Sequence, residues 1–215
     1  MRVRALLAAL AVGLSGCGAV GGGAAAAHGP APHAVATAPV MRVTQPTVRP
    51  LELTGAPPAP ATGGGGAPEP ARVRLPAIGV DSGLARLGLN GDGTIQVPPD
   101  PNQAGWYTGG PAPGEPGPAV IVGHLDSYTG PAVFHRLSAT RPGEEVWVSR
   151  ADGSRLRFVV QRVATFPVDG FPTQDVYGVT AEPGLRLITC GGAFSFAQRR
   201  YLSNVVVFAG LEEAT

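Results

Sequence analysis

Short segments that are apolar, or that alternate apolar and polar residues, recur over the last two thirds of the chain, with turn sequences between them. These segments, which are typical of β-strands, lie at residues 71–80, 93–98, 118–124, 144–150, 154–168, 184–190 and 204–210. Sequences rich in Gly, Pro, Asn and Asp lie between them, at residues 90–93, 111–118, 141–145 and 151–154. Only residues 130–139 and the region near 173–178 look able to hold a helical turn. The pattern predicts an all-β barrel or sandwich.

The first 27 residues have the pattern of an export signal. Arg2 and Arg4 precede an apolar stretch, which ends in the sequence LSGC at Cys17. LSGC resembles a lipobox, in which cleavage precedes the cysteine and the thiol carries a lipid. An uncleaved membrane anchor and an ordinary cleaved signal stay open as alternatives, since no charge occurs from Ala5 to Ala27. We expect the protein on the extracytoplasmic face of the cell membrane.

Residues 28–71 show neither helical nor alternating periodicity and are dominated by Pro, Ala, Gly and Thr. Such a composition cannot bury enough apolar surface to fold, so we expect a disordered linker with a mean reach of about 35 Å. The folded domain is expected at residues 72–212, which is long enough for one well-buried core.

Composition excludes several function classes. The formal net charge is +1 and all sixteen basic residues are arginine, so no nucleic-acid surface is indicated. No dense acidic cluster stands out, and we expect no metal ion and no cofactor. We expect a monomer that meets the membrane only through its N-terminus.

Cys190 is the only cysteine in the expected domain. If Cys17 is lipidated or lies in an anchor, Cys190 has no disulfide partner in an exported protein, where disulfides are the norm. It is then either an inert core residue, a common place for cysteine, or a nucleophile. A free cysteine is only about 3% thiolate at pH 7, so an active site has to shift its pKa.

His124 ends one apolar segment as Cys190 ends another, and polar residues follow it. In a barrel, two strand ends that open on the same rim can bring their side chains together. A cysteine with a histidine acid/base is a recurrent arrangement for acyl transfer. The competing His135 has apolar neighbours at helical spacing, which favours a partly buried structural histidine.

Arg199 and Arg200 precede the last apolar segment, where a guanidinium could stabilise an oxyanion. Period two along an extended chain places Arg200 on the face of Leu202 and Asn204, and Arg199 on the other. We choose Arg200, with Arg199 as the alternative. Either could instead be a solvated arginine at the entrance of a strand.

These residues together resemble the sortases, cysteine transpeptidases of the Gram-positive cell surface. The resemblance rests on LRLITCGG at 185–192, followed by arginine and a last strand, and on VGH about seventy residues upstream. The stretches at 78–137 and 171–178 are similar to class F sortases of actinobacteria. The resemblance covers about 140 residues.

The resemblance implies an eight-stranded sortase-type barrel, with Cys190 as nucleophile, His124 as acid/base and an arginine of the last strand as oxyanion stabiliser. It implies partners too: surface proteins with L-P-x-T-G-like C-terminal sorting signals, and an amine of a cell-wall precursor or protein. The chain departs from the family pattern at that arginine, because Leu202 and Asn204 occupy the nearest positions. A lipobox is also unusual in the family.

Other residues near the motif have weaker assignments. Thr189, directly before the cysteine, corresponds to a family position that shapes the substrate groove, but it could be an ordinary strand residue. Asp126 could orient the imidazole or cap a turn. Gly191 and Gly192 could let substrate approach or simply form a turn.

Two other functions compete with this interpretation. A non-catalytic exported β-domain that binds wall polymer or protein would need an inert Cys190. A cysteine transpeptidase that cross-links peptidoglycan would need an S-H-G-C-x-R signature, and Cys190 lies instead between Ile-Thr and Gly-Gly.

Overall fold

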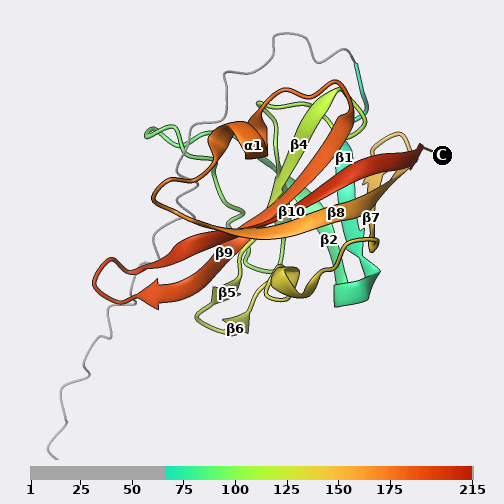
Figure 1. Ribbon diagram of the computed structural model, residues 1–215. Coiled ribbons are helices and arrows are strands. Elements are labelled where there is room, and N and C mark those ends of the chain that lie inside the picture. The colour runs from blue at the N-terminus through green and yellow to red at the C-terminus, as the bar shows by residue number, and fades with distance from the viewer. Residues whose placement is uncertain (1–65, 215) are drawn as a thin grey trace, which may run out of the picture. The chain divides into compact units, whose positions relative to one another are not determined.

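The computed structural model describes residues 66–214 and shows a closed barrel of eight strands in the order β1-β2-β3-β4-β9-β10-β8-β7 (Figure 1). The prediction of an eight-stranded all-β barrel is confirmed. The predicted targeting segment, Cys17 and all but the last six residues of the predicted linker lie outside the described residues. Among residues 66–214, no helix is long and apolar enough to cross a membrane.

The elements follow one another along the chain as short strands and single helical turns, with a long hairpin at the end. They are β1 (Pro70–Leu75), η1 (Pro76–Ile78), β2 (Val80–Leu87), β3 (Ala104–Tyr107), β4 (Gly117–Val122), β5 (Asp126–Ser127), β6 (Gly130–Pro131), η2 (Leu137–Ala139), β7 (Glu145–Arg150), β8 (Arg155–Pro167), α1 (Thr173–Tyr177), β9 (Pro183–Ser195) and β10 (Arg200–Ala214).

Two strand pairs of the barrel are parallel, and the second of them positions the site. β2 pairs with β3 and β4 pairs with β9 in parallel, whereas the other neighbours are antiparallel. Because β4 and β9 run in the same direction, their C-terminal ends lie at the same end of the barrel (Figure 1).

The barrel interior is filled by one set of alternating side chains. Leu185 and Leu187 of β9 and Val207 and Ala209 of β10 point inward and join apolar residues from every other barrel strand. Phe134 closes this core from the segment after β6 and is fully buried. Burial of this set is the main source of stability for the fold.

A second apolar cluster covers the outer face of β3, β4, β9 and β10. The alternate residues of the same strands, such as Ile188 and Val206, pack there against the buried Ile95 and α1. These strands are therefore buried on both faces, which explains why residues 118–122 read as a continuous apolar run. Cys190 packs against the edge of this outer cluster.

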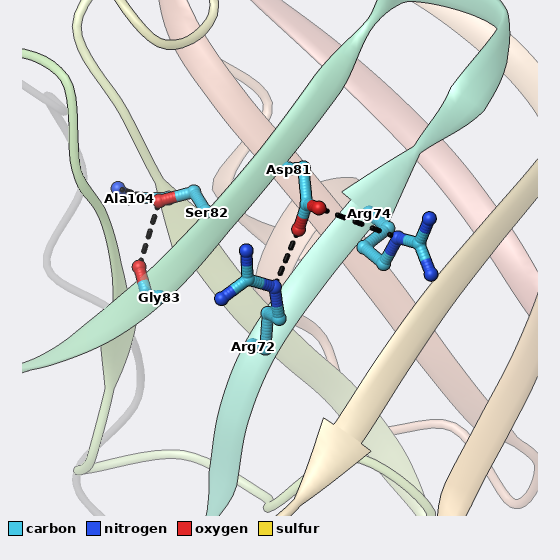
Figure 2. Close-up of polar contacts among 6 residues, drawn as sticks. All are labelled: Arg72, Arg74, Asp81, Ser82, Gly83 and Ala104. Atoms are coloured by element: carbon cyan, nitrogen blue, oxygen red, sulfur yellow. Dashed lines mark hydrogen bonds and ion pairs between the residues drawn. The ribbon is translucent and has the colours of Figure 1, made fainter.

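Polar contacts hold β1, β2 and β3 together (Figure 2). Asp81 of β2 accepts a hydrogen bond from Arg72 at 2.5 Å and lies 3.6 Å from Arg74. The hydrogen bond from Arg72 lowers the pKa of Asp81. The hydroxyl of Ser82 accepts a hydrogen bond from the Ala104 amide at 2.9 Å, which ties β2 to β3 (Figure 2).

Three local predictions need correction. Residues 71–80 form two strands rather than one, because Pro76 begins a 3-10 turn between β1 and β2. Residues 93–98 form no strand; Ile95 makes a single bridge to Leu89. β3 was not predicted. Of the two regions expected to hold a helical turn, 173–178 contains α1 and 130–139 contains η2.

Candidate active site

The parallel pairing of β4 and β9 brings the ends of both predicted motifs together. Val122 pairs with Ile188, and the amide of Gly123 donates a hydrogen bond to the Ile188 carbonyl at 3.1 Å. His124 follows immediately, and Cys190 lies two residues beyond Ile188 on β9. The two residues singled out from sequence therefore both lie just beyond the C-terminal limit of the β4–β9 pairing.

Gly123 allows the chain just before His124 to pack closely against the side chains of Phe134 and Val133. A Cβ at this position would come within 2.5 Å of Phe134 Cδ2 and 2.7 Å of Val133 Cγ1. The amide of Phe134 also donates to the His124 carbonyl at 2.9 Å. The backbone at His124 is therefore held on two sides, by β9 through Gly123 and by the buried segment around Phe134.

The imidazole of His124 is half-buried and held by one hydrogen bond. Its Nε2 lies 2.8 Å from the carbonyl oxygen of Pro98. A carbonyl oxygen can only accept, so Nε2 carries the hydrogen and donates it. Nδ1 is therefore the nitrogen left to take up a proton. His135, expected to be partly buried, is exposed instead, with Nδ1 3.0 Å from the Ala132 carbonyl.

Cys190 is a free, half-buried thiol. Burial raises its pKa from 9.0 to about 12, and the negative charge of Asp126 adds to the rise. Both causes stabilise the neutral thiol. The resting site therefore holds a protonated cysteine, and nothing in its surroundings lowers the pKa as it does in preformed thiolate–imidazolium pairs.

Asp126 is fixed in place by a residue of β10. The hydroxyl of Tyr201 donates a hydrogen bond to Asp126 Oδ2. Burial, followed by this hydrogen bond, raises the pKa of Tyr201 to about 12. Tyr201 also packs its ring edge-on against Phe194 of β9. This contact joins the loop after β4 to the β9–β10 hairpin beside the thiol.

We expect Asp126→Asn to increase the reactivity of Cys190. Removal of the negative charge lowers the thiol pKa, so a larger fraction is thiolate at any given pH. Alkylation by iodoacetamide, followed on the Cys190 peptide by mass spectrometry, should accelerate by about two- to tenfold at pH 8 and low salt. In the unmodified protein the rate should rise about tenfold per pH unit and reach no plateau below about pH 11.

The control for this prediction is Asp152→Asn, which changes an exposed carboxylate in the turn between β7 and β8. It should leave the alkylation rate unchanged. A plateau in the unmodified protein near pH 9, or equal rates for the Asp126 and Asp152 variants, would contradict the proposed cause. The raised pKa of Cys190 also makes the free energy of unfolding depend on pH. Burial of the neutral thiol contributes its full stability below pH 9.0, and this contribution is lost as the pH rises toward 12.

The two arginines occupy different positions. Arg199 is exposed and adopts a positive φ of 54° in the turn between β9 and β10. Arg200 begins β10, and its side chain is 18% exposed. Its Nε donates to Gln198 Oε1 at 2.9 Å, and its Nη2 lies 3.6 Å from Asp169 Oδ1, whose side chain is 90% exposed.

Strand register separates Arg200 from the thiol. Arg200 pairs with Ser195, whereas Asn204 is the residue directly opposite Cys190. Four residues of β-strand span about 13 Å, so the guanidinium has to extend along the strand to approach the thiol. Its ion pair with the exposed Asp169 is weak.

Thr189 is fully buried in the wall of the barrel. Successive side chains of a strand point to opposite faces, so Thr189 faces away from the Cys190 side of β9. Its Oγ1 has no hydrogen-bond partner among the described residues. Contact with substrate therefore stays a prediction.

Sequence reasoning missed three residues of the site. Pro98 and Tyr201 contact His124 and Asp126 through the fold, and no sequence pattern marks them. Asn204 was noted only as a position where the family pattern suggests arginine. Its place opposite Cys190 depends on the register between β9 and β10. Within residues 66–214, no group of three or more His, Cys, Asp or Glu could hold a metal ion.

Comparison with known families identifies the domain that carries these residues. The sortase-domain family model matches residues 73–212. The chain belongs to the sortase family. No curated protein matches it in sequence.

Solved structures agree with this assignment at the level of the fold. Sortase C-1 of Actinomyces oris is 21% identical, with a TM-score of 0.53 over 66% of this chain and 71% of the other. Sortase C of Streptococcus pneumoniae is 20% identical, with a TM-score of 0.51 over 67% of each chain. Sortase A of Listeria monocytogenes is 15% identical, with a TM-score of 0.52 over 69% of this sortase and 90% of the other.

Proposed function

We propose that this sortase is a cysteine transpeptidase of class F that cleaves an L-P-x-T-G-like sorting signal between Thr and Gly. One observation carries the proposal: parallel pairing of β4 with β9 places His124 and Cys190 at the same end of the barrel. A thiol beside a histidine suits acyl transfer through a thioester. The class assignment rests on the sequence stretches at 78–137 and 171–178.

The first half of the reaction forms the acyl-enzyme. Nδ1 of His124 takes the proton from Cys190 as Sγ attacks the carbonyl carbon of the threonine. The resulting tetrahedral intermediate collapses as its C–N bond breaks, and the imidazolium returns the proton to the departing glycine amine. The products are a thioester on Cys190 and a free N-terminal glycine.

The second half transfers the acyl group. An amine of a cell-wall precursor or of a protein attacks the thioester carbon, and His124 accepts the proton that the amine loses. The thiolate leaves and is reprotonated by the imidazolium. The net change is the exchange of one amide bond for another, with no oxidant, reductant or metal required.

The raised pKa of Cys190 determines when the thiolate forms. With a pKa of about 12, only about one thiol in 10⁵ is ionised at pH 7. Proton transfer to His124 therefore accompanies attack on bound substrate, and it does not precede binding. A substrate that excludes water from the groove strengthens this transfer by strengthening the electrostatic interactions inside it.

Arg200 is the proposed cation of the site, with Arg199 as the alternative. A guanidinium extended along β10 would act on negative charge that develops in the transition state. We expect Arg200→Lys to lower kcat/KM at least about a hundredfold, because lysine keeps the charge and loses the planar set of donors. The measurement is cleavage of an L-P-x-T-G peptide with an added amine.

Arg199→Lys is the matched control and should be nearly silent, since Arg199 lies exposed in the turn. Melting curves of both variants exclude unfolding as the cause. The reverse pattern would assign the role to Arg199. Two silent variants would remove arginine from the mechanism.

The direct test of the proposed function is the acyl-enzyme. Full-length protein mixed with an L-P-x-T-G peptide should gain the mass of the peptide up to threonine on the Cys190 peptide, and hydroxylamine should release it as a hydroxamate. No adduct with any such peptide would refute the proposal. Labelling with a thiol reagent discriminates poorly here, because a half-buried neutral thiol reacts slowly whether or not it is catalytic.

We propose further that the protein acts outside the cell membrane, attached through lipid on Cys17 or through an uncleaved apolar segment. The support is the sequence of residues 1–27. Its partners are then surface proteins whose sorting signals reach the same membrane face. Incorporation of a labelled lipid precursor at Cys17 is the measurement that separates the two kinds of anchor.

A further inference from the structure

Asn204 lies directly opposite Cys190 in the β9–β10 ladder. Opposed residues of antiparallel strands project to the same face, with Cβ atoms about 4.5–5.5 Å apart. Asn204 therefore shares the outer face of the sheet with the nucleophile. Val206 and Phe208 continue this face into the outer apolar cluster.

The side-chain amide of Asn204 is a buried hydrogen-bond donor without an acceptor among the described residues. The residue is 1% exposed, and its Nδ2 has no hydrogen-bond partner among the described residues. A buried amide group left without a partner destabilises the folded state, because the water it bound in the unfolded chain is not replaced. Such a group in a folded protein calls for a specific explanation, and a catalytic role is one of the recognised explanations.

Other buried polar atoms in the described part of the chain also lack partners, namely Thr140 Oγ1, Tyr177 Oη and Thr189 Oγ1. They differ from Asn204 in position. Thr189 points to the opposite face of β9, and Thr140 and Tyr177 lie outside the β9–β10 hairpin. Asn204 alone among these four is the cross-strand partner of Cys190.

We propose that Asn204 is a catalytic residue, whose Nδ2 donates a hydrogen bond to the oxyanion formed when Cys190 attacks the scissile carbonyl. This inference rests on the proposed transpeptidase function. The missing acceptor is supplied by the substrate: the carbonyl carbon becomes bonded to Sγ, which places its oxygen beside the residue that faces Cys190. A donor is effective when it lies about 2.7–3.1 Å from that oxygen.

A neutral donor suits the electrostatics of this thiol. A cation fixed opposite Cys190 would stabilise the thiolate and lower its pKa, whereas burial and Asp126 raise it. An amide leaves the resting thiol neutral and acts only once charge reaches the substrate oxygen. Arg200, four residues away on the strand, would then be a second donor that reaches the oxyanion by extending along β10.

The test compares two reactions of the same sulfur. Thioester formation with an L-P-x-T-G peptide passes through an oxyanion, whereas alkylation by iodoacetamide is a direct displacement without one. Asn204→Leu keeps the approximate volume and removes the donor. We expect the rate of acyl-enzyme formation to fall about 10²- to 10³-fold, on the scale of one lost oxyanion donor, while alkylation of Cys190 stays within about twofold.

The matched control is Gln161→Leu, which replaces an exposed amide on β8 and should change neither rate. Melting curves of the Asn204 variants exclude unfolding as the cause of a lower acylation rate. Asn204→Ala is the second variant, and it is expected to show the same selective loss if leucine does not fit.

The two rates distinguish a role on the oxyanion from a role on the thiol. Acylation by both Asn204 variants within threefold of the unmodified protein would overturn the proposal. A parallel fall in acylation and alkylation would overturn it too, because Asn204 would then act on the thiol and not on the oxyanion. If the unmodified protein forms no thioester with sorting-signal peptides but its Cys190 is alkylated, the proposed function itself fails.

Discussion

Replacing Cys190 by alanine is expected to abolish peptide cleavage and to leave the barrel folded. The thioester needs the sulfur, and Cys190 is the one cysteine within residues 66–214. The side chain only touches the edge of the outer apolar cluster, so its truncation should cost no more than about 1–2 kcal/mol of stability. Turnover followed by chromatography of the released glycine peptide should fall by at least about 10⁴-fold, to the limit of detection.

Cys190→Ser separates the need for sulfur from the need for a polar group. A serine hydroxyl ionises far less readily than a thiol, so we expect this variant to be inactive as well. The matched control is Cys17→Ala, which removes the other cysteine of the chain and should leave cleavage of a soluble peptide unchanged. Turnover that survives in Cys190→Ala and disappears in Cys17→Ala would contradict the assigned nucleophile.

The barrel could be predicted because its strands differ clearly from the turns between them. Residues 118–122 and 205–209 are apolar on both faces, and both faces are buried in the structure. β3 was missed because Ala104–Tyr107 is only four residues long and contains a glycine. Residues 93–98 alternate like a strand, but their alternation serves packing of Ile95 into the outer cluster and not a ladder of hydrogen bonds.

The sequence could predict only those residues of the candidate site that directly follow an apolar run. Cys190 and His124 each follow an apolar run, so their position at a rim was readable. The residues around them could not be predicted. Pro98 reaches His124 because a loop folds back, and Asn204 lies opposite Cys190 because of the register between β9 and β10. Register depends on how a whole hairpin pairs, and here the pairing is irregular between Tyr201 and Ser203.

The direction of the Cys190 pKa shift also lay beyond the sequence. A cysteine next to a histidine in a motif suggests activation by a lowered pKa, which is a common device. The structure shows the opposite, since the thiol is packed against apolar residues and near the carboxylate of Asp126. Both causes arise from tertiary contacts. In the proposed mechanism Cys190 therefore loses its proton during the reaction, and His124 is the group that has to accept it.

Replacing His124 is accordingly expected to have the second largest effect, after loss of Cys190. Without a base, a thiol with a pKa of about 12 supplies almost no thiolate, and the departing amine receives no proton. His124→Gln is the most informative substitution. The glutamine amide can still donate a hydrogen bond to the Pro98 carbonyl, but it has no nitrogen that can accept a proton.

We expect kcat/KM for an L-P-x-T-G peptide to fall about 10³- to 10⁴-fold in His124→Gln, with the melting temperature preserved. His135→Gln is the matched control and should be silent, since His135 is exposed and bonded only to the Ala132 carbonyl. The loss in His124→Gln should shrink as the pH rises toward 10, because hydroxide then ionises the thiol directly. A loss that stays constant with pH would mean that His124 serves the fold of the loop and not the transfer of the proton.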